Sequence, residues 1–98
     1  MNSKIKSKDV DFLFDVILQL KTREECYMLF EDLCTVQEMK ALSQRLVVAK
    51  MLSEGCVYSE IVKTTGASTA TISRVKRSLD YGCDSYSLVF GRLEAEEK

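Results

Sequence analysis

The sequence contains no proline and no histidine, and its four glycines all lie at or after Gly55. Proline and glycine are the residues that most often interrupt helices, so the chain before Gly55 can be helical with only short breaks. No apolar run approaches the roughly 18 residues that a membrane span needs, so we expect no membrane partner. The lack of histidine, of a phosphate-binding glycine loop and of a metal cluster argues against an enzyme, and we predict no catalytic residues.

The four cysteines are Cys26, Cys34, Cys56 and Cys83, and no two of them have Cys-x-x-Cys spacing. A structural zinc site would have to gather all four thiolates from scattered positions, so we expect neither a metal nor another cofactor. Cys26 and Cys34 fall on apolar helix faces and are expected in the core. Because no signal peptide is evident, we expect a cytoplasmic protein with free thiols.

Positive charge is concentrated in the middle of the chain, although the formal net charge of the whole is −1. Residues 40–79 carry seven basic and two acidic side chains, a net charge of +5, whereas residues 1–39 and 80–98 each have a net charge of −3. A local positive block of this kind is what a phosphate-binding surface requires. The charge distribution therefore predicts that the middle of the chain contacts nucleic acid.

The first predicted helix begins near Asp9 and carries two apolar stripes. One stripe comprises Val10, Leu13, Phe14, Ile17 and Leu18, and the other comprises Phe12, Val16 and Leu20. A helix that faces a single core needs only one such stripe. Burial on two sides in so short a chain indicates a second subunit, so we expect a homodimer.

Two capping boxes predict where the next helices begin. Thr22 with Glu25, and Thr35 with Glu38, match the Thr-x-x-Glu pattern that starts a helix. The helix after Thr35 should be long, about 18 residues, and should end at Gly55, which is typical of a helix C-terminus.

Residues 58–78 match a helix-turn-helix. Two helices that meet at a steep angle need a connecting residue that tolerates positive φ, and Gly66 supplies it. Ser68 is a good N-cap for the second helix, which should run to about Leu79. The core shared by the two helices is expected to consist of Ile61, Val62, Ala67, Ile72 and Val75.

The second helix of this pair carries hydroxyl-bearing and basic side chains. Short side chains near its start would let the backbone enter the major groove, and arginine and lysine can reach bases or phosphates. We predict base-proximal positions at Thr69, Ala70, Thr71 and Ser73, the N-cap Ser68 beside them, and mainly phosphate contacts from Arg74, Lys76 and Arg77. An exposed helix pair with a polar face and no DNA partner is the alternative that this pattern leaves open.

The predicted fold class is all-α with about six helices, the last of them over residues 84–94, because no segment alternates with the period of two typical of strands. We divide the chain into a flexible N-terminus (1–8), a single helical DNA-binding domain (9–94) and a loose acidic tail (95–98).

The run GASTATISRVKRSL, residues 66–79, resembles the DNA-reading helix of the Trp repressor family. The resemblance extends back through TVQEMKALSQRLVVAKMLSEG, residues 35–55, and the phrases EECYMLFEDLCT and GASTATISRVKR resemble the YerC/YecD branch related to Trp repressor. This resemblance implies an intertwined, all-helical homodimer with a helix-turn-helix projecting from each side.

The resemblance also implies a tryptophan pocket between the core and the reading helix. Arg74 and Ser78 match effector-binding positions on that helix, and Thr35 and Arg45 match two on the core helix if a one-residue gap is allowed. The residue after the arginine is glycine in Trp repressor but Val75 here, and its β-branched side chain would occupy ligand space. Our hypothesis is that tryptophan does not bind with useful affinity; the sequence leaves open an unknown small-molecule effector.

The sequence therefore predicts a sequence-specific transcription regulator that binds double-stranded DNA as a homodimer on a roughly palindromic operator. Repression is favoured over activation, because a protein bound at an operator commonly blocks transcription. The runner-up is a helical dimeric protein-interaction module without specific DNA binding.

Overall fold

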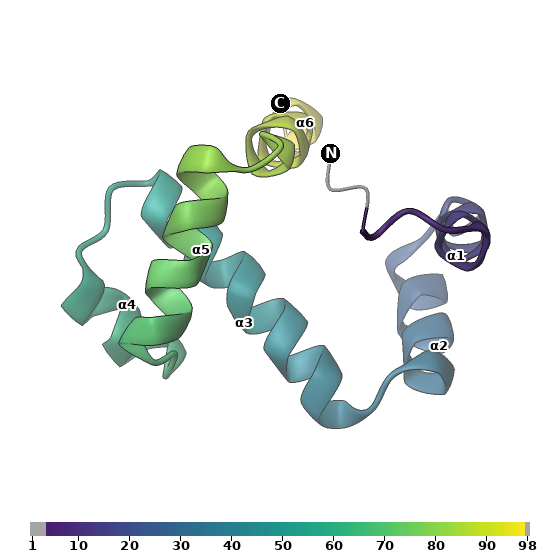
Figure 1. The fold of residues 1–98 in the computed structure, drawn as a ribbon, viewed down its shortest axis with the longest axis horizontal. Helices are drawn as coiled ribbons and strands as arrows, with labels where there is room; N and C mark the ends of the chain where they lie inside the picture. The colour runs from purple at the N-terminus through teal and green to yellow at the C-terminus, as the bar shows by residue number, and fades with distance from the viewer. Residues whose placement is uncertain (1–3, 98) are drawn as a thin grey trace. The chain divides into compact units, whose positions relative to one another are not determined.

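The computed structural model describes residues 4–97 and contains six α-helices in that range (Figure 1). They are α1 (Lys8–Ile17), α2 (Arg23–Leu33), α3 (Val36–Ser53), α4 (Tyr58–Thr65), α5 (Thr69–Tyr81) and α6 (Ser85–Glu97). No strand occurs among these residues, so the prediction of an all-α fold with about six helices is confirmed. No helix within residues 4–97 combines the length and the apolar character needed to cross a membrane.

The first and last helices each extend slightly beyond their predicted ends. α1 begins at Lys8 because Ser7 caps it, with Ser7 Oγ accepting a hydrogen bond from the backbone N–H of Val10 at 3.1 Å. α6 continues past Glu94 to Glu97, so residues 95–97 are helical instead of loose. Alanine and glutamate are good helix formers, and no stop signal follows Glu94. Of the segments predicted to be flexible or loose, residues 1–3 and 98 lie outside the described residues.

The helix starts predicted at Thr22 and Thr35 are confirmed, and the complete, reciprocal capping box forms at Thr35. Thr22 Oγ1 accepts from the N–H of Glu25 at 3.1 Å, although the Glu25 carboxylate accepts from Lys21, one residue before the cap. Thr35 Oγ1 accepts from the N–H of Glu38 at 3.1 Å, and Glu38 Oε1 accepts from the N–H of Thr35 at 2.8 Å. The bonds from the Thr35 backbone and side chain lower the pKa of Glu38, because they stabilise its charged form.

The chain divides into two compact units between Met39 and Lys40. All of the buried apolar residues among the described ones belong to the second unit: Val48, Ala49, Ile61, Ala67, Ile72 and Val75. They come from α3, α4, α5 and the turn between α4 and α5, so the core of this unit lies directly behind the helix-turn-helix.

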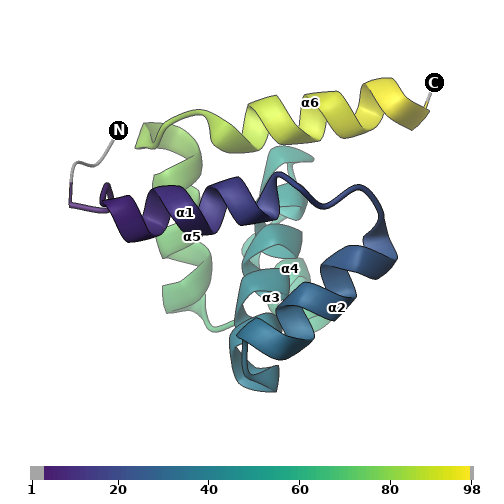
Figure 2. The ribbon, with the colours of Figure 1, turned by 90° about the vertical axis from the view of Figure 1, so that its right-hand side faces the viewer.

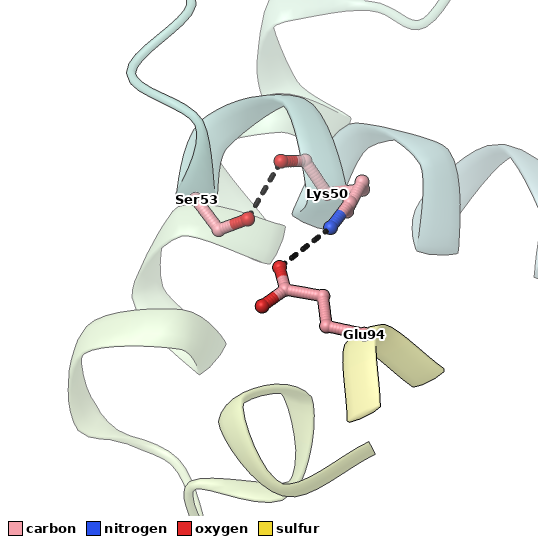
Figure 3. Close-up of polar contacts among 3 residues, drawn as sticks. All are labelled: Lys50, Ser53 and Glu94. Carbon is pink, nitrogen blue, oxygen red and sulfur yellow. Dashed lines mark hydrogen bonds and ion pairs between the residues drawn. The ribbon is translucent and has the colours of Figure 1, made fainter. Parts of the chain in front are cut away.

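α6 crosses the C-terminal ends of α3 and α5 (Figure 2). Its aromatic residues Tyr86 and Phe90 stack with ring centroids 5.9 Å apart and pack against the core. Lys50 of α3 lies at the outer side of this contact, with its Nζ 5.3 Å from the centroid of the Phe90 ring. The same Nζ lies 3.4 Å from Glu94 Oε1 (Figure 3). These exposed contacts each add about 1 kcal/mol or less, so the packing of Tyr86 and Phe90 on the core does most to hold α6 in place.

The first unit has no buried residue in α1 or α2. Of the two stripes predicted on the first helix, Phe12 and Leu18 are 70% and 77% exposed and Phe14 is exposed as well. The other stripe residues are half-buried: Val10, Leu13, Val16, Ile17 and Leu20. Cys26, expected in the core, is exposed, and Cys34 is half-buried. The expectation that Cys26 lies in the core is therefore wrong for the single chain, and the cover that a second subunit would give the stripes of α1 stays a prediction.

Candidate DNA interface

The helix-turn-helix is formed by α4, a three-residue turn and α5. Gly66 ends α4 with φ of 72°, and its N–H donates to Val62 O at 2.9 Å. The Ser68 side chain accepts from the N–H of Thr71 at 3.1 Å and so begins α5. The predicted turn at Gly66 and the predicted N-cap at Ser68 are both confirmed.

Four of the five residues predicted for the shared core are buried. Ile61 and Ile72 are fully inaccessible, and Ala67 and Val75 are nearly so. Val62 was predicted wrongly, because it is 37% exposed. It lies four residues after Tyr58, and residues four apart share one helix face, so Val62 belongs to the outer face of α4.

A polar anchor that sequence reasoning missed ties the turn to α3. Gln44 Nε2 donates to the carbonyl of Thr65, the last residue of α4, at 3.1 Å. The Thr65 hydroxyl donates to Ile61 O at 2.7 Å and accepts from the N–H of Ala67 at 3.1 Å. Together these bonds satisfy polar groups at the end of α4 and fix the turn that sets the direction of α5. The available signal was a glutamine within the long helix, which by itself does not identify its partner.

Seven of the eight predicted DNA-binding residues belong to α5, whose buried side carries Ile72 and Val75, and the eighth, Ser68, is its N-cap. Seven of the eight are exposed, and the half-buried one is Thr71. The Thr71 hydroxyl accepts from Ser68 Oγ at 3.1 Å, so these two side chains shape the start of the helix. The exposed ones are Ser68, Thr69, Ala70, Ser73, Arg74, Lys76 and Arg77.

The three basic side chains of this face differ in their surroundings. Lys76 Nζ lies 3.2 Å from Asp80 Oδ1, one turn further along α5. Arg74 and Arg77 have no ion pair among residues 4–97. Two of the three cations are therefore available for an external anion without the loss of an existing partner.

The residues proposed for an effector pocket have other local roles. Thr35 is engaged in the capping box of α3, and Arg45 Nε donates to Ala41 O of its own helix at 3.3 Å. Arg74 and Ser78 are exposed on α5. None of these four side chains lines the groove that lies between the first half of α3 and the end of α4, which is bordered by Lys40, Ser43, Gln44, Val47, Thr64 and Thr65.

Val75 is a core residue of the second unit, with 3% of its surface exposed. It packs in one cluster with Val48 and Ala49 of α3 and with Ile72 of its own helix. Its β-branched side chain thus occupies space behind α5 that a glycine would leave empty.

Cys56, one of the two cysteines near helix ends, packs against the core. Burial raises the pKa of the Cys56 thiol, and the negative charges of Glu60 and Glu54 raise it further. A thiol with a raised pKa stays protonated at neutral pH and is a poor nucleophile, so nothing at Cys56 favours redox chemistry.

These features define an all-helical protein with a helix-turn-helix whose second helix presents a polar and basic outer face. Residues 8–94 match the family model for the Trp repressor protein, so the chain belongs to the Trp repressor family, which is a family of transcription regulators and not of enzymes. The family resemblance found in the sequence is therefore confirmed.

Relatives support the same assignment. The chain is 54% identical over 94 residues to the uncharacterized protein YerC of Bacillus subtilis (strain 168), covering 96% of this chain and 90% of YerC. Its fold matches the crystal structure of a candidate Trp repressor from Staphylococcus aureus with a TM-score of 0.91 and 54% identity, over 94% of this chain and 92% of the other. A TrpR-like protein from Eubacterium eligens matches with a TM-score of 0.92 and 56% identity, over 95% and 96% of the two chains.

Proposed function

We propose that this protein is a sequence-specific DNA-binding transcription regulator, with repression favoured over activation. The observation that carries the proposal is the outer face of α5, where exposed hydroxyl and methyl side chains precede exposed cations on a helix whose opposite side is fully packed. Rigid support matters because base readout requires side chains held in a defined position. Membership of a family of transcription regulators supports the same function.

The mode of contact follows from the order of residues along α5. Thr69, Ala70 and Ser73 are short enough to let the start of the helix enter the major groove, where bases present distinct hydrogen-bonding patterns. Arg74 and Arg77, which have no ion pair among residues 4–97, supply phosphate contacts, and Arg74 is the basic side chain that we propose for reading a guanine. Thr71 acts near the bases through the part of its side chain that remains accessible.

A homodimer is the functional unit in this proposal. Large apolar side chains of α1, its C-cap and α2 are exposed in the single chain, including Phe12, Phe14, Leu18, Tyr27, Met28 and Leu33. We infer that a partner covers these side chains, and a second copy of the chain is the partner that the family fold implies. Two helix-turn-helix elements would then meet successive major grooves about 34 Å apart, so the operator should be roughly palindromic.

We also propose that tryptophan is not the effector. Val75 fills space behind α5 with a buried side chain, and Thr35 and Arg45 are engaged within their own helix. Isothermal titration calorimetry of the protein with L-tryptophan should give no heat of binding. Micromolar binding would contradict this part of the proposal and would require α5 to move away from the core.

An electrophoretic shift assay tests DNA binding directly. The purified chain is mixed with a random-sequence duplex at low salt, where phosphate contacts are strongest. We expect a shift that weakens as salt is added and that is reduced in Arg77→Ala, whereas Arg92→Ala, which removes the same charge from α6, should leave it unchanged. No shift under these conditions would favour the alternative, a dimeric protein-interaction module.

A further inference from the structure

An acidic residue lies on the predicted DNA-binding face of α5. Asp80 is the only acidic residue of this helix, and its carboxylate is 3.2 Å from Lys76 Nζ. Both side chains are accessible, at 46% for Lys76 and 39% for Asp80, so the pair faces solvent.

The helical spacing aligns this pair with the base-proximal residues. Thr69, Ser73, Lys76 and Asp80 follow one another at intervals of four, three and four, which places them along one stripe of the helix. A helix whose start enters the major groove carries the later residues of that stripe toward the phosphate backbone. Asp80 thus adds a negative charge where Lys76 and Arg77 would meet phosphates.

Helix stability does not account for the presence of Asp80. It is the second-last residue of α5, where the helix dipole disfavours a carboxylate. The order of the pair, with lysine four residues before the acid, is also the weaker of the two possible orders. The pair therefore adds little to folding and can be broken when a stronger anion approaches.

We propose that Asp80 limits the affinity of the protein for DNA by holding Lys76 away from phosphate and by repelling the backbone. This inference rests on the proposed DNA binding. If Asp80 acts in this way, the neighbouring residues Lys76 and Arg77 contribute differently to DNA binding: Arg77 makes a full phosphate contact and Lys76 makes a partial one. The effect is independent of base sequence, because it acts on phosphates.

The test measures fluorescence anisotropy of labelled duplexes with the full-length chain between about 50 and about 200 mM salt. One duplex carries the best sequence obtained by in vitro selection, and the other is an unrelated duplex of equal length. Each recruited phosphate contact changes the slope of log K against log salt by about 0.9. Asp80→Asn should therefore bind both duplexes more tightly at about 0.1 M salt, by up to roughly eightfold for each subunit whose Lys76 gains a full phosphate contact.

Asp84→Asn is the matched control. It removes the same charge four residues further on, in the link to α6, and asparagine tolerates the positive φ of 61° at this position. Its affinity and salt slope should stay close to those of the wild type. Circular dichroism of each variant confirms that the helices are retained.

A double-mutant cycle isolates the Lys76–Asp80 pair. In the wild-type background, Lys76→Ala should flatten the salt slope less than Arg77→Ala does. In the Asp80→Asn background, the two substitutions should flatten the slope by the same amount. The inference is overturned, while the proposed function stands, if Asp80→Asn binds the duplexes with the same affinity as Asp84→Asn. It is also overturned if Lys76→Ala lowers the affinity by the same factor in both backgrounds. If neither the wild type nor Asp80→Asn binds either duplex, both are overturned.

Discussion

The helix pairs α1–α2 and α4–α5 are both joined by short connections, but their apolar side chains have different surroundings. In the α4–α5 pair, Ile61 and Ile72 are fully buried against α3. In the α1–α2 pair no residue is buried, and Phe12 is 70% exposed. The apolar side chains of α4–α5 are therefore buried within one chain, whereas α1–α2 keeps apolar side chains that are exposed to water in the single chain.

The difference fits separate roles for the two units, DNA contact for the second and association with another copy for the first. A DNA-reading element gains from a fixed geometry that does not depend on a partner, because base contacts tolerate little displacement. An element that forms a dimer interface gains from apolar side chains that become buried only when a second copy binds, because their burial then contributes favourable free energy to association. Matched substitutions in the two regions should therefore have different effects.

The largest effect is expected in the core behind the helix-turn-helix. Ile72→Ala should destabilise each chain by about 2–5 kcal/mol, because it empties a fully buried site. Val62→Ala, also within the helix-turn-helix but 37% exposed, should cost about 1 kcal/mol or less. Chemical denaturation of both variants measures the two free energies of unfolding. Equal costs would mean that the core assigned to this unit is incorrect.

The next effect is expected at α1 and should appear in assembly. Phe12→Gln removes an exposed apolar side chain but retains a good helix former. If each copy of Phe12 is buried at a twofold interface, the loss is about 3–6 kcal/mol, or two or more orders of magnitude in the dimer dissociation constant. Sedimentation equilibrium measures this constant.

Asp15→Gln is the matched control on the same helix, since Asp15 is exposed and has no ion pair among residues 4–97. It should leave the dissociation constant nearly unchanged. A Phe12→Gln protein with wild-type assembly would show that the exposed stripe on α1 does not form the interface.

The smallest effect concerns the capping box at the start of α3. The pKa of Glu38 is lower in the folded chain than in the unfolded one, so the carboxylate contributes stability above its unfolded pKa of about 4.3. That contribution should be lost as the pH falls through the lower, folded value. Glu38→Gln retains a capping side chain but cannot titrate, so its unfolding free energy should depend less on pH below about 4.3 than that of the wild type.

Thermal unfolding of both proteins at a series of acidic pH values measures this dependence. Identical pH profiles would show that the hydrogen bonds between Thr35 and Glu38 do not persist in solution.

The features predicted correctly are those fixed by short-range chemistry. The capping boxes at Thr22 and Thr35, the positive φ at Gly66 and the N-cap at Ser68 depend on residues within four positions of one another. Local stereochemistry alone determines them, so the order of the helices could be predicted from the sequence.

The features that were missed depend on neighbours distant in sequence. The apolar spacing could not say that Val62 faces outward, or that Phe12 and Leu18 are exposed in the single chain. The hydrogen bond from Gln44 to Thr65 spans 21 positions and needs the packing of α4 on α3 before it can be identified. For the candidate site, the residues of α5 and their exposure were predictable, whereas the Lys76–Asp80 pair became evident only from side-chain geometry.

In vitro selection of DNA bound by the purified, full-length chain tests the central claim most directly. A dimer that presents the outer face of α5 on both sides should enrich a palindromic consensus with half-sites about one helical turn apart. Thr69→Asp, which places a negative charge at the start of that face, should abolish the enrichment. A pool with no consensus after repeated rounds, or a consensus unchanged by Thr69→Asp, would contradict the proposal that α5 reads DNA.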